Sequence, residues 1–162
     1  MCKTKKDRVK TVAVLAIAAL AAWIFAEHFM WSPTNSLRER CFWRLKSQAM
    51  KDRIGHGSLV EFNRFVPEPK PKVYSLIKRV ACAEGEVLEY RPGHREFYCN
   101  EHYLGRAKEK TRMGTPLKPF EYVGQVPKGK MFVMGDHIDS YDSRYWGFLD
   151  KSEVKSKVVG LF

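Results

Sequence analysis

The chain has 162 residues, of which 44% are hydrophobic and 13% aromatic, and it carries a formal net charge of +11 with a pI near 9.6. This composition suits one globular domain with length left over for an anchor, and it argues against an intrinsically disordered chain. The excess of cations favours an anionic partner, such as a membrane surface or a nucleic acid. Because the sequence holds no nucleic-acid recognition motif, we expect no nucleic-acid partner.

The N-terminal segment has the composition of a membrane-spanning helix. Residues 1–10 carry five cations and one anion, and Thr11 to Ala26 carry no charge. Those sixteen residues would form a helix about 24 Å long, and continuation to Trp31 matches a hydrocarbon core of about 30 Å. The basic flank places the N-terminus in the cytoplasm. The predicted organisation is a cytoplasmic tail over 1–10, a transmembrane anchor over 11–31 and an exported domain over 32–162.

Two other interpretations of this segment remain open. A cleaved signal peptide has the same basic start and short apolar run, and Ala21-Ala22 could supply its cleavage site. A buried helix of a soluble protein is disfavoured, because the alanine-rich run has no polar face to turn toward water. The anchor and the signal peptide both predict that the body of the protein is exported.

From residue 32 onward, the pattern is typical of an antiparallel all-β domain. Runs rich in β-branched and aromatic residues alternate with glycine and proline turns. Residues 37–50 lack this pattern, and we expect them to be helical or irregular. The predicted strands lie within 55–65, 72–82, 86–105, 131–134 and 157–162, with turns at Pro92-Gly93 and Asn100-Glu101 inside the third range.

Export makes disulfide bonds possible among the cysteines beyond the N-terminal segment. Cys82 and Cys99 flank a predicted strand pair and are placed to form a bridge. The alternative is that both are small buried hydrophobic residues, because sequence alone does not give their geometry.

Lys78 lies in an unusually apolar stretch, YSLIKRVAC, for a charged residue. If the side chain points inward, burial lowers the pKa of the amine and makes it a competent general base. If it points outward, it is an ordinary lysine on a solvent-facing strand. The strand pattern alone leaves both possibilities open.

The stretch VPKGKMFVMGDHIDSYDSRYWGF resembles the C-terminal motif of type I signal peptidases. That motif has Gly-Asp, a short polar loop and then Ser-x-Asp-Ser-Arg-Tyr-Trp-Gly, which here are Gly135-Asp136 and the run from Ser140 to Gly147. A second stretch, LIKRVACAEGE, resembles the lysine box of the same family. GHGSLVEF resembles the strand that lies between the family's serine and lysine boxes.

The serine box resembles that of the conjugative-transfer branch, the TraF-type peptidases. That branch has Thr-x-Ser followed by a hydrophobic residue and later an aromatic residue, and this chain reads SPTNSLRERCFW. On this register Ser36 is the nucleophile and Thr34 lies two residues before it. Arg38 and Arg40 stand where the branch has Pro and Gly, and Ser32 is the alternative nucleophile.

The resemblance implies a signal-peptidase-like β domain that acts as a serine endopeptidase with a Ser36/Lys78 dyad. Ser-Lys pairs are a variant of the catalytic triad, and no cofactor or metal is expected. The implied supporting roles are an oxyanion site from the Ser36 N–H and the Thr34 hydroxyl, Ser140 orienting the Lys78 amine, an Asp142–Arg144 ion pair locking the loop, and Asp136 shaping the turn beside the base.

The expected substrate is an exported precursor protein, in particular a conjugative pilin precursor, which is hydrolysed or joined end to end. The expected location is the inner membrane, with the catalytic domain in the periplasm and membrane lipid as a second partner. Two alternatives from other classes remain: a non-catalytic, membrane-anchored scaffold of a conjugation or secretion apparatus, and a basic protein that binds DNA or phospholipid.

Overall fold

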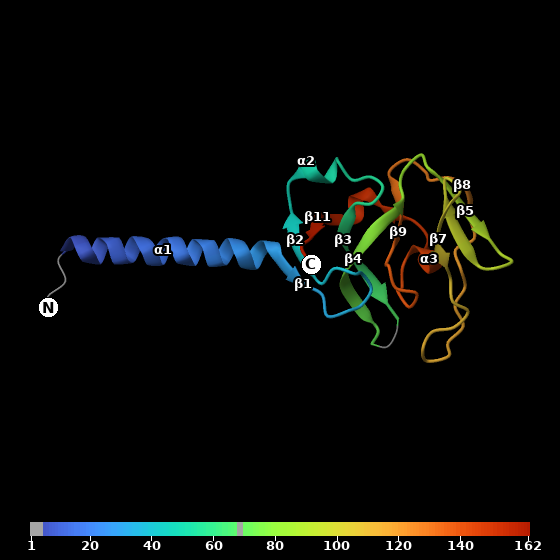
Figure 1. The fold of residues 1–162 in the computed structure, drawn as a ribbon, viewed down its shortest axis with the longest axis horizontal. Helices are drawn as coiled ribbons and strands as arrows, with labels where there is room; N and C mark the ends of the chain where they lie inside the picture. The colour runs from blue at the N-terminus through green and yellow to red at the C-terminus, as the bar shows by residue number, and fades with distance from the viewer. Residues whose placement is uncertain (1–4, 68–69) are drawn as a thin grey trace.

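The computed structural model describes residues 5–67 and 70–162, which form a long N-terminal helix followed by a β domain (Figure 1). Helix α1 spans Lys5–His28. Residues 5–10 of the predicted tail are therefore helical, and the rest of that tail lies outside the described residues.

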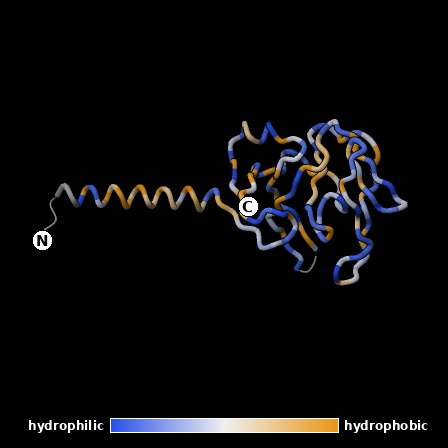
Figure 2. The backbone as a smooth tube through the Cα atoms, viewed as in Figure 1, coloured by the Kyte–Doolittle hydropathy of each residue, from blue (hydrophilic) through white to orange (hydrophobic). Residues whose placement is uncertain are grey.

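Within the described ranges, one helix is long and apolar enough to cross a membrane, over Arg8–His28. Its apolar window is not covered by the rest of the protein, and Figure 2 shows the hydrophobic colour along most of its length. The helix ends three residues before the predicted limit, because Phe29–Trp31 forms strand β1 and pairs with β2. An apolar run cannot by its periodicity distinguish a helix end from a short strand.

The domain after α1 has the antiparallel β structure that the sequence predicts, and its strands form two sheets. The larger sheet has the spatial order β1 (Phe29–Trp31), β2 (Cys41–Leu45), β11 (Val154–Gly160), β3 (Leu59–Val66), β4 (Lys72–Cys82), β9 (Lys130–Met134) and β10 (Leu149–Asp150). The smaller sheet has the order β7 (His102–Arg106), β6 (Glu96–Cys99), β5 (Val87–Arg91) and β8 (Val123–Gln125). Three short helical turns complete the described chain: α2 (Gln48–Lys51), α3 (Ser143–Trp146) and η1 (Lys151–Glu153).

The segment 37–50, expected to be helical or irregular, contains strand β2 and the single turn of α2. β2 lies between β1 and β11, and the Phe42 side chain is fully buried there. Its strand conformation therefore depends on partners far away in the sequence, which a local pattern cannot reveal.

An ion pair with a buried carboxylate joins β3 to β2. Glu61 is 4% exposed, and Arg44 of β2 donates to both of its carboxylate oxygens at 2.9 and 3.0 Å. The Ser75 and Ser156 hydroxyls donate to the same carboxylate at 2.8 and 2.7 Å. Burial alone would raise the pKa of Glu61, but the hydrogen bonds from Arg44, Ser156 and Ser75 lower it below its ordinary value.

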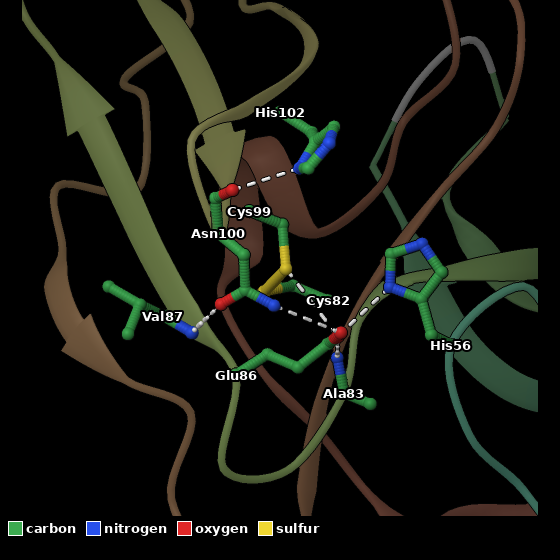
Figure 3. The surroundings of a disulfide bond; sticks show 8 residues. All are labelled: His56, Cys82, Ala83, Glu86, Val87, Cys99, Asn100 and His102. Carbon is green, nitrogen blue, oxygen red and sulfur yellow. Dashed lines mark hydrogen bonds and ion pairs between the residues drawn. A yellow bond between two sulfur atoms is a disulfide. The ribbon is translucent and has the colours of Figure 1, made fainter.

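Cys82 and Cys99 form a disulfide bond, which connects β4 of the larger sheet to β6 of the smaller one (Figure 3). The predicted bridge between the two cysteines is therefore confirmed. Beside the bond, the Glu86 carboxylate accepts hydrogen bonds from the Ala83 N–H and from the Asn100 amide. The disulfide thus fixes the relative position of the two sheets at the end of β4.

Candidate active site

Ser36 and Lys78 meet although 42 residues separate them in the sequence. Lys78 lies on β4, and its amine donates a hydrogen bond to Ser36 Oγ at 2.5 Å. The Lys78 side chain is inward and only 3% of the residue is exposed, so the outward alternative is wrong. A hydroxyl in direct contact with a buried amine is the arrangement needed to activate a serine.

The environment of Lys78 favours the neutral amine. Burial lowers the pKa of Lys78 from its ordinary value of 10.5 to about 8. The Asp142 carboxylate opposes this shift, Arg144 adds to it, and Asp136 opposes it. The net effect is a base that is partly unprotonated near neutral pH.

The loop that carries Ser36 is held against the segment that follows β9. The Arg38 N–H donates to Asp136 Oδ2 at 3.1 Å, and the His137 N–H donates to the Ser36 carbonyl at 3.3 Å. Gly135 permits this approach, because a Cβ there would lie 2.6 Å from the Ser36 carbonyl oxygen. The glycine of the Gly-Asp motif is therefore needed for the nucleophile loop to pack closely.

Arg79 links the same loop to β4. Its guanidinium donates to the two carboxylate oxygens of Glu39 at 3.0 and 3.2 Å and lies 3.5 Å from Asp136 Oδ1. Sequence reasoning did not assign a role to Arg79 or Glu39. The position of Arg79 directly after Lys78 was a usable signal, whereas no feature of the sequence pointed to Glu39.

The expected ion pair between Asp142 and Arg144 is formed and buried. The Arg144 Nε and Nη2 atoms each lie 2.8 Å from an Asp142 carboxylate oxygen, and the two side chains are 2% and 0% exposed. Asp142 also accepts the N–H of Gly135 and caps α3. Arg144 donates further to the carbonyls of Arg106, His137 and Ser140. The pair therefore ties the motif to the turn beside Lys78.

Ser140 and Thr34 do not make the contacts of their expected roles in this structure, which contains no substrate. Among the described residues, the Ser140 hydroxyl is buried without a hydrogen-bond partner, so no hydrogen bond joins it to Lys78. Thr34 is exposed, and its hydroxyl is hydrogen-bonded to Ser32 Oγ at 3.1 Å rather than directed to an oxyanion site. The structure thus brings Ser36, and not Ser32, to the lysine.

His56, Glu86 and Cys99 form the group of potential metal ligands found among the described residues. The sulfur of Cys99 belongs to the disulfide, so it lacks the thiolate charge that a metal ligand requires. The His56 ring instead lies 2.9 Å from a Glu86 carboxylate oxygen (Figure 3). This group is a hydrogen-bonded support of the disulfide region.

Comparison with known proteins gives matches to signal peptidases over nearly the whole chain. A sequence model of the family described as signal peptidase, peptidase S26, matches residues 5–162. The chain is 28% identical to signal peptidase I U of Bacillus subtilis (strain 168) in an alignment 159 positions long, which covers 86% of this chain and 80% of that protein. It is 25% identical to signal peptidase I of Bacillus caldolyticus in an alignment 185 positions long, which covers 98% of this chain and 92% of that protein.

A shorter match of 117 residues, 28% identical, is to signal peptidase I of Buchnera aphidicola subsp. Schizaphis graminum. It covers 60% of this chain and 36% of that protein, which is therefore much the longer of the two. The matched range contains Ser36, Lys78 and the Gly135-Asp136 turn beside them. The chain accordingly belongs to the signal peptidase family, peptidase S26, a family of serine peptidases that act on exported precursors.

Proposed function

We propose that this protein is a membrane-anchored endopeptidase that removes the leader segment of exported precursors, with Ser36 as the nucleophile and Lys78 as the general base. The observation that supports this most directly is the 2.5 Å contact between Ser36 Oγ and an amine that is 3% exposed. An exposed lysine would be protonated at neutral pH and could not accept the hydroxyl proton.

In the acylation step, neutral Lys78 accepts the proton of the Ser36 hydroxyl while Oγ attacks the scissile carbonyl carbon. The tetrahedral adduct collapses to an ester on Ser36, and the Lys78 ammonium returns its proton to the departing amine. In deacylation, Lys78 removes a proton from the attacking water and passes it to the departing Ser36 Oγ, so that the ester breaks to give the product carboxylic acid, which then ionises, and the free Ser36 hydroxyl. Each step leaves the base in the state required for the next one.

The oxyanion of the tetrahedral adduct would be stabilised by the Ser36 N–H and by the Thr34 hydroxyl. Thr34 would first exchange its hydrogen bond to Ser32 for one to the oxyanion. A donor of this kind contributes about 3 kcal/mol to transition-state stabilisation. Ser140, with its unpaired buried hydroxyl, is proposed as a partner for the Lys78 amine once the proton has moved.

Asp142, Arg144 and Asp136 are proposed as positioning residues. The buried Asp142–Arg144 pair holds Gly135, and Asp136 holds the backbone of Arg38 two residues after the nucleophile. Their common effect is to keep the Ser36 carbonyl against the Gly135 turn, where Oγ can reach the lysine.

The proposed location is the inner membrane, with a cytoplasmic N-terminus, α1 as the single span and residues 32–162 in the periplasm in contact with lipid. The length, hydropathy and exposure of Arg8–His28 support the span. The Cys82–Cys99 disulfide supports an oxidising compartment for the β domain.

The proposed preferred substrate is a small pilin precursor of a conjugation system, in keeping with the TraF-type serine box. Arg38 and Arg40 are exposed beside the nucleophile and could bind an acidic segment of such a substrate. The Ser36 ester could then be attacked by water or by the amino terminus of the same pilin, held at high effective concentration. The intact mass of the processed pilin distinguishes these fates, because ring closure gives a product about 18 Da lighter than the linear chain, the mass of one water.

The assignment of the dyad is tested by precursor cleavage with the full chain in membranes. Ser36→Ala and Lys78→Ala should each abolish cleavage, whereas Ser32→Ala should retain it. Circular dichroism verifies that the variants fold. Cleavage that persists in Ser36→Ala and is lost in Ser32→Ala would identify Ser32 as the nucleophile. Full cleavage by both dyad variants would favour the non-catalytic scaffold.

A further inference from the structure

A cleft begins beside the dyad and runs between the two sheets. Its volume is about 630 Å³. Its lining includes Arg79 and Asp136, which contact the nucleophile loop, and Gly135, which packs against the Ser36 carbonyl. The opposite wall is β7, from Tyr103 to Arg106. The cleft thus borders the loop that carries Ser36 and the residue that follows Lys78 on β4.

The cleft lies on the side of the dyad that faces away from α1. On β4, Ile77 precedes Lys78 and belongs to the hydrophobic cluster against which Met30 of β1 packs, and β1 follows the helix directly. The residues after Lys78, from Arg79 to Ala81, line the cleft instead. Figure 1 shows the smaller sheet at the end of the domain remote from α1. A precursor that shares a membrane with α1 would reach Ser36 from the β1 side, and its chain beyond the cut would continue into the cleft.

The shape of the cleft suits an extended peptide. β7 is an edge strand of the smaller sheet, and in the described chain it pairs with β6 alone. Edge strands offer backbone donors and acceptors to a peptide in an extended conformation. Val80, Met134 and Ile138 add apolar residues to the lining of the cleft.

Arg106 gives the cleft an unneutralised positive charge. Two other arginines of the lining are already paired, Arg79 with Glu39 and Arg144 with Asp142. Arg106 is exposed, and its side chain makes no ion pair with any described residue. A carboxylate on the bound peptide would therefore find a cation that is not already used.

We infer that this cleft binds the first residues after the scissile bond, in an extended conformation along β7, and that Arg106 selects precursors with an acidic residue in that segment. This inference rests on the proposed function, since it places the cut at Ser36. Arg106 is a specificity-determining residue in this account and takes no part in bond cleavage.

The test uses the full chain in detergent and two precursors that are identical up to the cut. One carries glutamates, and the other lysines, at the third to fifth positions after it. The unmodified protein should favour the acidic precursor by about fivefold in kcat/KM, mainly through KM, as expected for one partly exposed ion pair. Arg106→Glu should reverse the preference, and Arg106→Lys should keep it.

Lys155→Glu is the matched control, because Lys155 is an exposed cation on β11 that does not line the cleft. It should leave the ratio of the two precursors unchanged. Equal use of the two precursors by the unmodified protein, or an unchanged ratio in Arg106→Glu, overturns the inference while Ser36-dependent cleavage persists. Cleavage that survives Ser36→Ala refutes the proposed function itself, so the two failures are distinguishable.

Discussion

At the scale of single residues, the burial of Lys78 determines how activity should depend on pH. The pKa of this amine is lowered to about 8. Below that pH the amine is protonated and cannot accept the Ser36 proton, so kcat/KM should rise as the pH increases through about 8 and level off above it. The measurement is a profile of precursor cleavage from pH 6 to pH 11. A rise centred near the ordinary lysine value of 10.5 would contradict the burial of the base.

Asp136→Asn provides a control on the origin of this profile. The Asp136 carboxylate raises the pKa of Lys78, opposing the effect of burial. Its neutralisation should therefore move the profile to lower pH without abolishing cleavage, provided that the amide still accepts the Arg38 N–H.

The same burial predicts that the proposed base destabilises the fold. At pH 7 the amine is charged in both the folded and the unfolded chain, and the lowered pKa of Lys78 corresponds to a cost of about 3 kcal/mol. Lys78→Met should raise the free energy of unfolding at pH 7. Its advantage should shrink as the pH rises from about 8 through 10.5, because above that range the lysine amine is neutral in both the folded and the unfolded chain. Urea unfolding at a series of pH values measures this. An equal or lower stability of the variant at pH 7 would refute it.

At the scale of secondary-structure elements, Glu61 joins four strands through one carboxylate. It accepts hydrogen bonds from Arg44 on β2, Ser75 on β4 and Ser156 on β11. Glu61→Gln removes the charge and leaves Arg44 without its partner, so it should lower the free energy of unfolding by about 2 kcal/mol. Thermal unfolding of the full chain in detergent measures the loss.

Glu153→Gln is the comparison for this variant. Glu153 pairs with Arg64, and its side chain is 45% exposed, so its loss should cost less than about 1 kcal/mol. Because the pKa of Glu61 is lowered, its contribution is complete above the ordinary glutamate value of 4.5 and disappears as the pH falls through the lower folded value. Equal losses in the two variants at neutral pH would argue against a special role for the buried pair.

Strands with a clear local pattern could be predicted from the sequence, and strands that depend on distant partners could not. β3, β4, β5 and β6 have β-branched and aromatic runs bounded by turn residues, so their positions followed directly. β1 is hidden at the end of an apolar run, and β2 follows a charged segment. Both became recognisable only when their pairing with each other and with β11 was known.

The candidate site likewise contains features that could be predicted from sequence motifs and features that could not. The identities of Ser36 and Lys78 follow from sequence motifs, and so does the Asp142–Arg144 pair. The Glu39–Arg79 contact does not, because it joins side chains 40 residues apart that carry no shared pattern. The hydrogen bond of Thr34 to Ser32 is likewise a property of the folded loop.

At the scale of the whole molecule, the disulfide connects the sheet that carries Lys78 to the sheet that forms the far wall of the cleft. Cys82 and Cys99 are 17 residues apart, and closing a loop of this length stabilises a protein by about 3 kcal/mol. The double variant Cys82→Ala/Cys99→Ala should lose about that much free energy of unfolding.

Treatment with a reductant distinguishes the effect of losing the disulfide bond from the effect of replacing the cysteine side chains. Complete reduction should lower the midpoint of denaturation of the unmodified protein and leave that of the double variant unchanged. The single variant Cys41→Ala, which removes the buried free thiol, should still respond to the reductant. Equal stability of the oxidised and reduced protein would show that packing alone holds the two sheets together.

The junction between α1 and the β domain has a mechanical consequence. The helix ends at His28 and β1 begins at Phe29, so no spare chain separates them. His28 Nδ1 lies 2.7 Å from the Arg44 carbonyl, its ring stacks on Trp43, and Lys46 pairs with Glu27. The helix therefore continues into the domain without a linker. With α1 as the proposed membrane span, this junction would hold Ser36 at a set distance from the bilayer, so that the position of a bond relative to the membrane, as well as its side chains, would decide whether Ser36 can reach it.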